Sequence, residues 1–402
     1  MDLSLKDIEL AAARLKDVLH HTELDLSSTF SAMTGGQVYL KCENRQKTGS
    51  FKLRGASNKI AALAERGEVS SVVASSAGNH AQGVAFAAKK FGIPATIVMP
   101  ATAPIAKVQA TENYGAKVVL CGDCYDDAYA KACELCEKEG ATFLHPYNDP
   151  EVIAGQGTLG LEILSDLPTV DIIVVPAGGG GLLAGVAACV KQINPRIRVV
   201  GVQAEGADAI CRSFSEKKLV CTDSVSTIAD GIAVKAPGDI TVGLINRYVD
   251  DIVTVSDNEI SEAILLLMER CKQIVEPAGA TPVAAVLKGK IDVSDKRVVC
   301  LLSGGNIDVS FIQCIIEQGL VARHRRMRFT VTLLDKPGNL AKLLNDIASL
   351  GANILSLEHD RLAAGLNPNE TNVHIACEVG GEEHGKKVAS VLAGKGYKIK
   401  VQ

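Results

Sequence analysis

The chain has 402 residues, of which 47% are hydrophobic and 22% are charged. This composition is ordinary for globular proteins, and the length predicts two or three domains with a large buried core. The net charge of −4 gives no reason to expect nucleic-acid binding. No apolar run reaches the roughly eighteen residues that a membrane-spanning helix needs, so no membrane helix is expected.

The cysteines and the N-terminal segment bear on the compartment. The twelve cysteines are scattered through apolar segments, which is typical of reduced, buried thiols rather than a disulfide framework. Residues 1–20 mix both charge signs and lack the apolar core of a signal peptide. They predict an amphipathic helix beginning near Ser4, because apolar residues recur from Ile8 to Val18. We therefore expect a cytoplasmic protein.

Short apolar runs then alternate with longer helical patterns, such as 81–91 and 182–192. The runs are rich in valine and isoleucine, which is typical of parallel strands buried on both faces. They are 38–41, 72–75, 95–99, 117–121, 171–176, 198–203 and 297–302. The loop-rich stretch 145–158 separates two strand–helix series. The expected fold is therefore α/β with two open parallel-sheet subdomains, the smaller (about 42–150) inserted in the larger.

The composition changes after Gly319. Residues 321–327 are basic and lack periodicity, so they are interpreted as a solvated linker between domains 1–320 and 328–402. The last part predicts the order strand, helix, strand, strand, helix, strand. The segments are 328–334, 337–350, 352–359, 371–379, 382–392 and 397–401. This βαββαβ order is typical of a ferredoxin-like domain.

The segment KTGSFKLRGA (47–56) places Lys52 next to the aromatic ring of Phe51. A lysine that forms a Schiff base must be desolvated enough to lose its proton near neutral pH. By itself, however, the segment is better interpreted as an ordinary solvated lysine. The segment SSAGNHAQG (75–83) follows a strand, and its small residues would let backbone amides approach an anion closely. An ordinary strand–helix turn fits this second segment equally well.

Four consecutive glycines carry a stronger signal. Gly178, Gly179, Gly180 and Gly181 lie between a strand and a helix, so no side chain blocks the amides and the helix dipole favours a dianion. We interpret them as a phosphate cradle rather than a flexible turn. The lysine of a P-loop and the spacing of a dinucleotide fingerprint are both missing. Ser303, in LLSGGN (301–306), follows the last strand, at the carboxyl edge where parallel sheets bind ligands.

Taken together and in this order, these segments resemble the fold-type II enzymes that use pyridoxal 5′-phosphate (PLP). Within that family the chain is similar to catabolic threonine dehydratases (threonine ammonia-lyases) with a C-terminal ACT domain, and the resemblance covers nearly the whole chain. The connecting stretches HPYNDP (145–150), GQGT (155–158) and EPAGA (276–280) match as well.

The resemblance implies a role for each residue. Lys52 would hold PLP as a Schiff base and remove the Cα proton, and Phe51 would pack beside the ring. Asn79 would bind the ring hydroxyl, the amides of Gly178 to Leu182 the phosphate, and Ser303 the pyridine nitrogen. The substrate carboxylate would bind at four residues: Ser76, Ala77, Gly78 and His80. A neutral serine at the pyridine nitrogen weakens the electron sink, which favours prompt loss of a β-leaving group.

The implied reaction converts L-threonine to 2-oxobutyrate and ammonia, and L-serine to pyruvate. Racemases of this family place a second acid/base serine where this chain has Ala77, so elimination is favoured. A racemase, a β-replacing relative, or an amino-acid sensor that has lost catalysis remain the alternatives. The ACT-like domain implies an amino-acid effector and pairing of subunits in a homodimer or homotetramer. Its expected effector residues are Pro337, Gly338, Asn339, Leu340 and Asn353.

No metal is expected. Cys121, Cys124, Cys133 and Cys136 have a zinc-like pair spacing, but two of them lie in a predicted helix where cysteine acts as a small apolar residue. Some relatives bind a divalent cation through the loop that starts at Glu205, but this chain has Cys211 where they have an aspartate. His145 is interpreted as a structural histidine.

Overall fold

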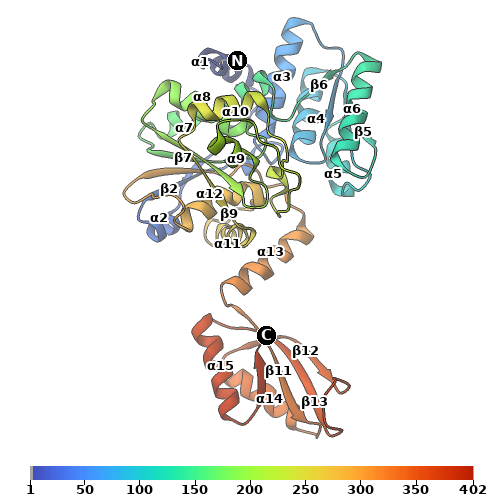
Figure 1. Ribbon diagram of the computed structural model, residues 1–402, viewed down its shortest axis with the longest axis vertical. Coiled ribbons are helices and arrows are strands. Elements are labelled where there is room, and N and C mark those ends of the chain that lie inside the picture. The colour runs from blue at the N-terminus through green and yellow to red at the C-terminus, as the bar shows by residue number, and fades with distance from the viewer. Residues whose placement is uncertain (1–2, 402) are drawn as a thin grey trace. The chain divides into compact units, whose positions relative to one another are not determined.

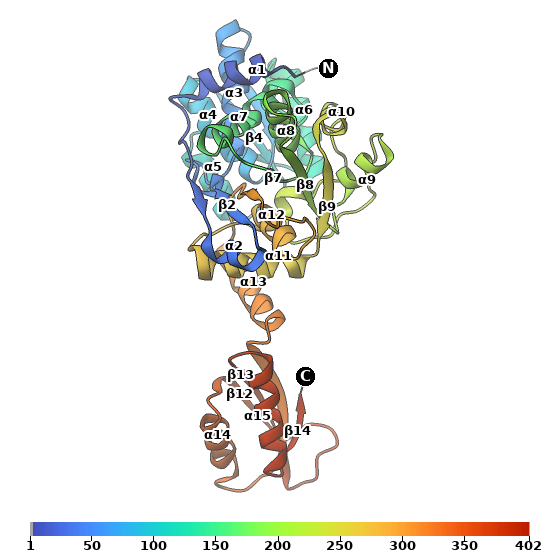
Figure 2. The same cartoon turned by 90° about the vertical axis from the view of Figure 1, so that its left-hand side faces the viewer.

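The computed structural model describes residues 3–401, which divide into two compact units, 1–308 and 309–402. Figures 1 and 2 show both units. The division falls twelve residues before the boundary expected at 320, because the chain enters a helix of the second unit at Val309. No described helix is both long enough and apolar enough to cross a membrane.

A six-stranded sheet forms the centre of the first unit, in the order β1-β2-β10-β7-β8-β9. Only the pair β1–β2 is antiparallel. Three strands, β7, β8 and β10, carry the near-continuous apolar runs that predicted them, and both of their faces are buried. The bounds are β1 Leu24–Leu26, β2 Gln37–Lys41, β7 Ile172–Pro176, β8 Arg198–Ala204, β9 Asp251–Val255 and β10 Arg297–Leu301.

Helices cover both faces of this sheet (Figure 1). The N-terminal helix begins after Ser4, whose hydroxyl accepts a hydrogen bond from the amide of Asp7, as the sequence predicted. The helices are α1 Leu5–Leu15, α2 Ser28–Thr34, α7 Pro150–Asp166, α8 Gly181–Ile193, α9 Ala209–Glu216, α10 Asp239–Tyr248, α11 Asp257–Leu266 and α12 Pro277–Leu287. Shorter helical turns are η1 Glu43–Arg45, η2 Asp230–Ile232 and η3 Leu267–Cys271.

The expectation of a loop-rich stretch over 145–158 was wrong for its second half. Helix α7 begins after Asp149, whose carboxylate caps the amides of Glu151 and Val152, and Pro150 occupies the first turn. The glycines at 155 and 157 lie in that stretch, and glycine is a poor helix former. They are helical here because neighbouring helices pack directly against them.

The smaller parallel sheet has the order β5-β4-β3-β6. Its strands are β3 Val72–Ser75, β4 Ala95–Met99, β5 Lys117–Leu120 and β6 Thr142–Phe143, and its helices are α3 Lys52–Arg66, α4 Asn79–Phe91, α5 Ile105–Asn113 and α6 Tyr125–Glu139. The predicted arrangement of two open parallel sheets is confirmed.

The second unit has the predicted βαββαβ order, preceded by α13 Val309–Ala322. Its antiparallel sheet has the order β12-β13-β11-β14, and its core includes Phe329, Leu343, Ile375 and Leu392. The elements are β11 Arg326–Leu334, α14 Asn339–Ser349, β12 Asn353–Asp360, β13 Glu370–Glu378, α15 Glu382–Gly394 and β14 Lys398–Val401. Between α13 and β11 only residues 323–325 remain, so the segment expected as a linker is largely ordered into its flanking elements.

Candidate active site

Lys52 is the first residue of α3 and lies in a desolvated position. Its Nζ donates a hydrogen bond to the carbonyl oxygen of Pro146 at 2.9 Å and lies 5.3 Å from the centroid of the Phe51 ring. Burial lowers the pKa of Lys52 to about 8, although the carboxylate of Glu276 acts in the opposite direction. The lowered pKa makes a free amine more available near neutral pH than for a solvated lysine, which is the direction that the sequence argument required.

Asn79 is the first residue of α4 and is fixed by two neighbours. Its Nδ2 donates to both carboxylate oxygens of Glu276, at 2.8 and 2.9 Å, and its Oδ1 accepts from Nδ2 of Asn306 at 2.8 Å. Burial raises the pKa of Glu276 to about 7, while the hydrogen bond from Asn79 acts to lower it. Lys52 and Asn79, which the sequence predicted separately, therefore share Glu276 as a neighbour.

Glu276 itself was not predicted as a site residue. It precedes Pro277, the first residue of α12, within the EPAGA segment. A charged residue at a helix start has an ordinary explanation as a solvated helix-end charge, and nothing in the sequence indicated that this carboxylate would be 4% exposed. The available signal was the EPAGA segment itself, which was used only as a connecting match.

Ser303 lies just beyond the carboxyl end of β10 and is buried. Its carbonyl oxygen accepts a hydrogen bond from the amide of Phe51 at 3.0 Å. The next residue, Gly304, forms an antiparallel bridge with Ser50. The end of β10 is therefore joined directly to the turn that carries Lys52, although the two are about 250 residues apart in the sequence.

The tetraglycine segment connects β7 to α8, and close neighbours explain the absence of side chains. A Cβ on Gly179 would lie 2.4 Å from the ring of Tyr147, and one on Gly181 would lie 2.9 Å from the Tyr147 carbonyl oxygen. Gly180 has φ +92°, and α8 has no side-chain cap. Uncapped amides at the start of a 13-residue helix, reached without a Cβ, fit a phosphate group.

The segment 75–80 places a second uncapped helix start at the carboxyl end of β3. Gly78 precedes α4 without a side-chain cap, and Ser76 Oγ accepts a hydrogen bond from the Gly78 amide at 3.2 Å. Ala77 presents only a methyl group. The His80 ring is buried, with its Nε2 3.0 Å from the Leu144 carbonyl oxygen. Burial, with the nearby Lys52, lowers the pKa of His80 to about 3, so its ring is neutral and only its amide is free to serve a carboxylate.

His145 has the structural role expected of it. Its Nδ1 accepts hydrogen bonds from the amides of Tyr147, at 3.3 Å, and Asn148, at 2.9 Å. Burial and the nearby Lys52 lower the pKa of His145 to about 4. The side chain of Asn148 in turn donates to Asp239 at 2.8 Å. This histidine therefore holds the loop that packs on the tetraglycine segment.

Neither metal alternative gains support. Among residues 3–401, no group of three histidine, cysteine, aspartate or glutamate side chains is arranged to hold a metal ion. Cys211, which stands where cation-binding relatives have an aspartate, lies in the first turn of α9, and its amide donates to Oε1 of Gln203 at 2.8 Å. The absence of a cation at Glu205 stays a prediction.

The family comparison identifies the class of protein. The family described as pyridoxal-phosphate dependent enzyme matches residues 15–304. This chain therefore belongs to the family of PLP-dependent enzymes.

Relatives match almost the whole chain. It is 50% identical over 399 residues to an L-threonine ammonia-lyase from Thermotoga maritima, covering 99% of each chain. It is 46% identical to a second one from Geobacter sulfurreducens, covering 98% of each. The predicted resemblance to threonine dehydratases is confirmed.

Two solved structures resemble the fold. A threonine deaminase isoform 2 from Solanum lycopersicum has a TM-score of 0.76 at 37% identity, over 79% of this chain and 87% of that one. A maize serine racemase has a TM-score of 0.75 at 37% identity, over 81% of this chain and 100% of that one. Proteins named as a threonine deaminase and as a serine racemase therefore share this fold.

The pKa of Lys52 predicts how the cofactor-free protein takes up PLP. Only the unprotonated amine attacks the aldehyde, so the rate of covalent attachment should rise about tenfold per pH unit below about pH 8 and then level off. In Glu276→Gln the levelling should occur at lower pH, because the carboxylate that raises the pKa of Lys52 is gone. The rate is measured by absorbance at fixed PLP. A wild-type rate that keeps rising to pH 10 would show that Lys52 is solvated.

Proposed function

We propose that this enzyme converts L-threonine to 2-oxobutyrate and ammonia, and L-serine to pyruvate and ammonia, by α,β-elimination. The water lost at the β-carbon is regained when the product is hydrolysed, so the atoms balance. The observation that carries the proposal is the desolvated Lys52 beside Asn79 and Glu276. The 50% identity to a protein named L-threonine ammonia-lyase, over 99% of both chains, supports the choice of substrate.

The site residues divide the work between cofactor and substrate. Bound PLP supplies an electron sink that acidifies the substrate Cα–H bond. The amides of Gly178 through Leu182 would hold its phosphate, Asn79 would turn a donor from Glu276 to its ring hydroxyl, and Ser303 would offer a neutral hydroxyl to the pyridine nitrogen. Phe51 packs beside the ring. All of these groups lie at the carboxyl edges of the strands or at the helix starts that follow them.

Lys52 Nζ is the base that takes the Cα proton, and its lowered pKa matches that task. The substrate carboxylate is held at the uncapped start of α4 by the amides of Ala77, Gly78 and His80, together with the Ser76 side chain. The neutral His80 ring adds no charge there. The β-hydroxyl would leave as water with the proton that Lys52 Nζ took from Cα.

Ala77 favours elimination over racemisation. Racemisation needs an acid or base on each face of the substrate carbon, and a methyl group has no proton to exchange. The maize serine racemase shares the fold, so racemase activity is the second candidate. The lowered pKa of Lys52 disfavours a sensor without catalysis. A lysine that takes part in no reaction gains nothing from burial and is ordinarily solvated, with an unshifted pKa.

We further propose that residues 328–402 are an ACT-like regulatory domain that binds an amino acid and pairs subunits into a dimer or tetramer. Helix α14 starts after Gly338, which has φ +93°, without a side-chain cap, and Asn339 Nδ2 donates to the Leu334 carbonyl oxygen at 2.9 Å. The proposed effector residues are Pro337, Gly338, Asn339, Leu340 and Asn353.

We also propose a cytoplasmic location. All twelve cysteines are free thiols, which is the usual state of cysteines in that compartment.

A product assay tests the proposal. PLP-loaded protein should release 2-oxobutyrate from L-threonine and pyruvate from L-serine, and chiral analysis should find D-serine at less than about one-tenth of the pyruvate. Isoleucine, valine, serine and threonine, added separately, should include one that changes the rate. Equal amounts of D-serine and pyruvate would favour the racemase. Protein that binds an amino acid but releases no ketoacid would favour the sensor.

A further inference from the structure

Helix α3 carries Lys52 at its start but has no side-chain cap of its own. Its first turn is held instead by helix α7. The side chain of Gln156 accepts a hydrogen bond from the amide of Gly55 at 3.2 Å. The GQGT segment (155–158), which the sequence comparison matched without giving it a role, therefore lies directly against the turn that carries Lys52.

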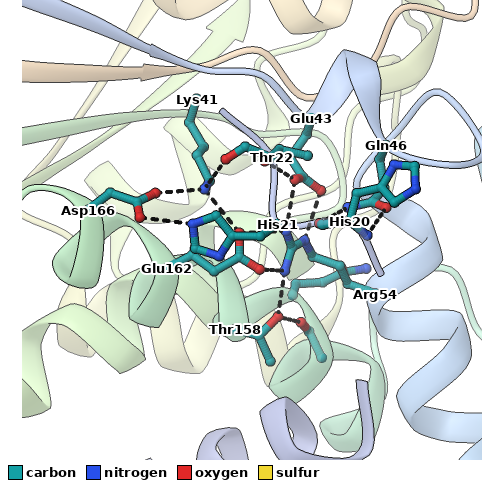
Figure 3. Close-up of polar contacts among 12 residues, drawn as sticks. His20, His21, Thr22, Lys41, Glu43, Gln46, Arg54, Thr158, Glu162 and Asp166 are labelled. Atoms are coloured by element: carbon teal, nitrogen blue, oxygen red, sulfur yellow. Dashed lines mark hydrogen bonds and ion pairs between the residues drawn. The ribbon is translucent and has the colours of Figure 1, made fainter. Parts of the chain in front are cut away.

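The strongest contact between the two helices is made by Arg54. Its guanidinium is fully buried, and all five of its N–H donors have acceptors. Nε and Nη2 donate to the two oxygens of Glu43, each at 2.8 Å. Nη1 donates to Thr158 Oγ1 at 3.1 Å, and Nη1 and Nη2 donate to Glu162 at 2.7 and 3.0 Å. Figure 3 shows this arrangement, which we call the Arg54 network.

The network extends beyond its core. Thr22 Oγ1 donates to the buried Glu43 at 2.7 Å, and the buried Lys41 contacts both Glu162, at 3.0 Å, and Asp166, at 3.1 Å. A buried ionic cluster of this kind adds little stability over apolar residues of the same size, because desolvation offsets the attraction. What it does supply is direction, since a planar guanidinium with every donor engaged has one orientation.

Arg54 does not reach Lys52 itself. Successive helix residues are rotated by about 100°, so side chains two positions apart point to roughly opposite sides of the helix. Any influence on Lys52 must therefore pass through the backbone turn. That backbone is closely packed: a Cβ on Gly155 of α7 would lie 2.7 Å from both the Arg54 carbonyl oxygen and Gly55 Cα.

The other side of α7 contacts α8, the helix that begins at the tetraglycine segment. A Cβ on Gly185 of α8 would lie 2.4 Å from the Ile153 carbonyl oxygen and 2.8 Å from the Gly157 amide nitrogen. Gly155 and Gly157 thus bring α3 and α8 against opposite sides of one helical turn of α7. This turn is a rigid spacer between the lysine and the phosphate cradle.

We propose that the Arg54 network is a positioning device, which, with the glycines of α7, sets the distance between Lys52 and the amides of Gly178–Gly181. Arg54, Thr158 and Glu162 are therefore positioning residues for the covalent attachment of PLP. If Lys52 is displaced, the glycine amides can still bind the cofactor phosphate, but the Lys52 amine reacts poorly with the cofactor aldehyde. This inference rests on the cofactor and not on the identity of the amino-acid substrate.

Two PLP-site ligands separate positioning from general stability. The full-length protein is freed of cofactor and titrated with PLP and with 4′-deoxypyridoxine 5′-phosphate, which has the phosphate and ring but no aldehyde. In Glu162→Gln, and more mildly in Thr158→Val, the Kd for PLP should rise about tenfold or more, because a misplaced amine loses much of the effective concentration that alignment gives it. The Kd for the deoxy analogue should stay within about twofold of wild type.

Asp171→Asn is the matched control. This variant also removes a carboxylate that accepts three hydrogen bonds from an arginine, Arg297. Asp171, however, lies just before β7, at the edge of the sheet opposite the site. It should leave both Kd values unchanged, even where its Tm falls as far as that of Glu162→Gln. Equal weakening of both ligands in the network variants, or unchanged PLP affinity in both, would overturn the proposal. If wild-type protein binds PLP tightly but does not convert L-threonine, the proposed substrate is rejected and the positioning proposal is not.

Discussion

Lys52→Ala is expected to lose covalent attachment of PLP and to form 2-oxobutyrate at least about 10³-fold more slowly than wild type. Two tasks disappear together, because in the proposed mechanism the same amine binds the aldehyde and takes the Cα proton. Borohydride reduction followed by mass analysis should give a label on Lys52 in the wild type and none in the variant. Turnover of L-threonine provides the second measurement.

Lys52→Arg is the control for charge and size. The guanidinium keeps a positive charge next to Phe51, but it does not lose its proton in proteins, so both losses should persist. PLP should still bind both variants reversibly, because the cradle at Gly178–Gly181 belongs to another element. A variant that keeps more than about one-tenth of the wild-type rate would show that the base is another residue.

Gly179→Ala is expected to weaken PLP binding at least tenfold. The added Cβ would lie 2.4 Å from the ring of Tyr147, so either the ring or the cradle has to move. Overpacking of this kind costs about 1–3 kcal/mol, and here the cost falls on the amides that we propose hold the phosphate. The Kd for PLP and the free energy of unfolding measure the two effects.

Two variants accompany this test. Gly243→Ala adds the same methyl group to α10, where nothing lies within 4 Å of the new Cβ, and it should leave the Kd for PLP unchanged. Tyr147→Ala combined with Gly179→Ala removes the clash and should recover much of the affinity for the deoxy analogue. If Gly179→Ala binds PLP as tightly as Gly243→Ala does, the segment is flexible and does not form a rigid cradle.

Much of the fold followed from the sequence because its signals were local. Apolar runs located seven strands within a few residues, and the βαββαβ order of the last part was correct. The strands β1, β6 and β9 were not predicted, because two to five residues of mixed character give little pattern. Helix α7 was partly misread because its glycines reflect contacts with α3 and α8 rather than local preference.

The sequence allowed the candidate site residues to be named one by one, but not the contacts that join them. The glycine cradle and Lys52 each carry a chemical signature in the residues around them. Glu276 and the Arg54 network do not, because ordinary glutamates and arginines are solvated, and only the folded chain shows which of them are enclosed together. Their roles depend on contacts between residues about 100 to 200 positions apart.

The position of β10 in the large sheet has a consequence for how the protein is made. This strand pairs with β2 on one side and β7 on the other, yet it is the last strand of the sheet in the sequence. A ribosome must therefore pass residue 301 before the gap is filled, and until then two strand edges stay open to mispairing. The edges of β2 and β7 that β10 covers are therefore the last in this sheet to be paired as the chain is made.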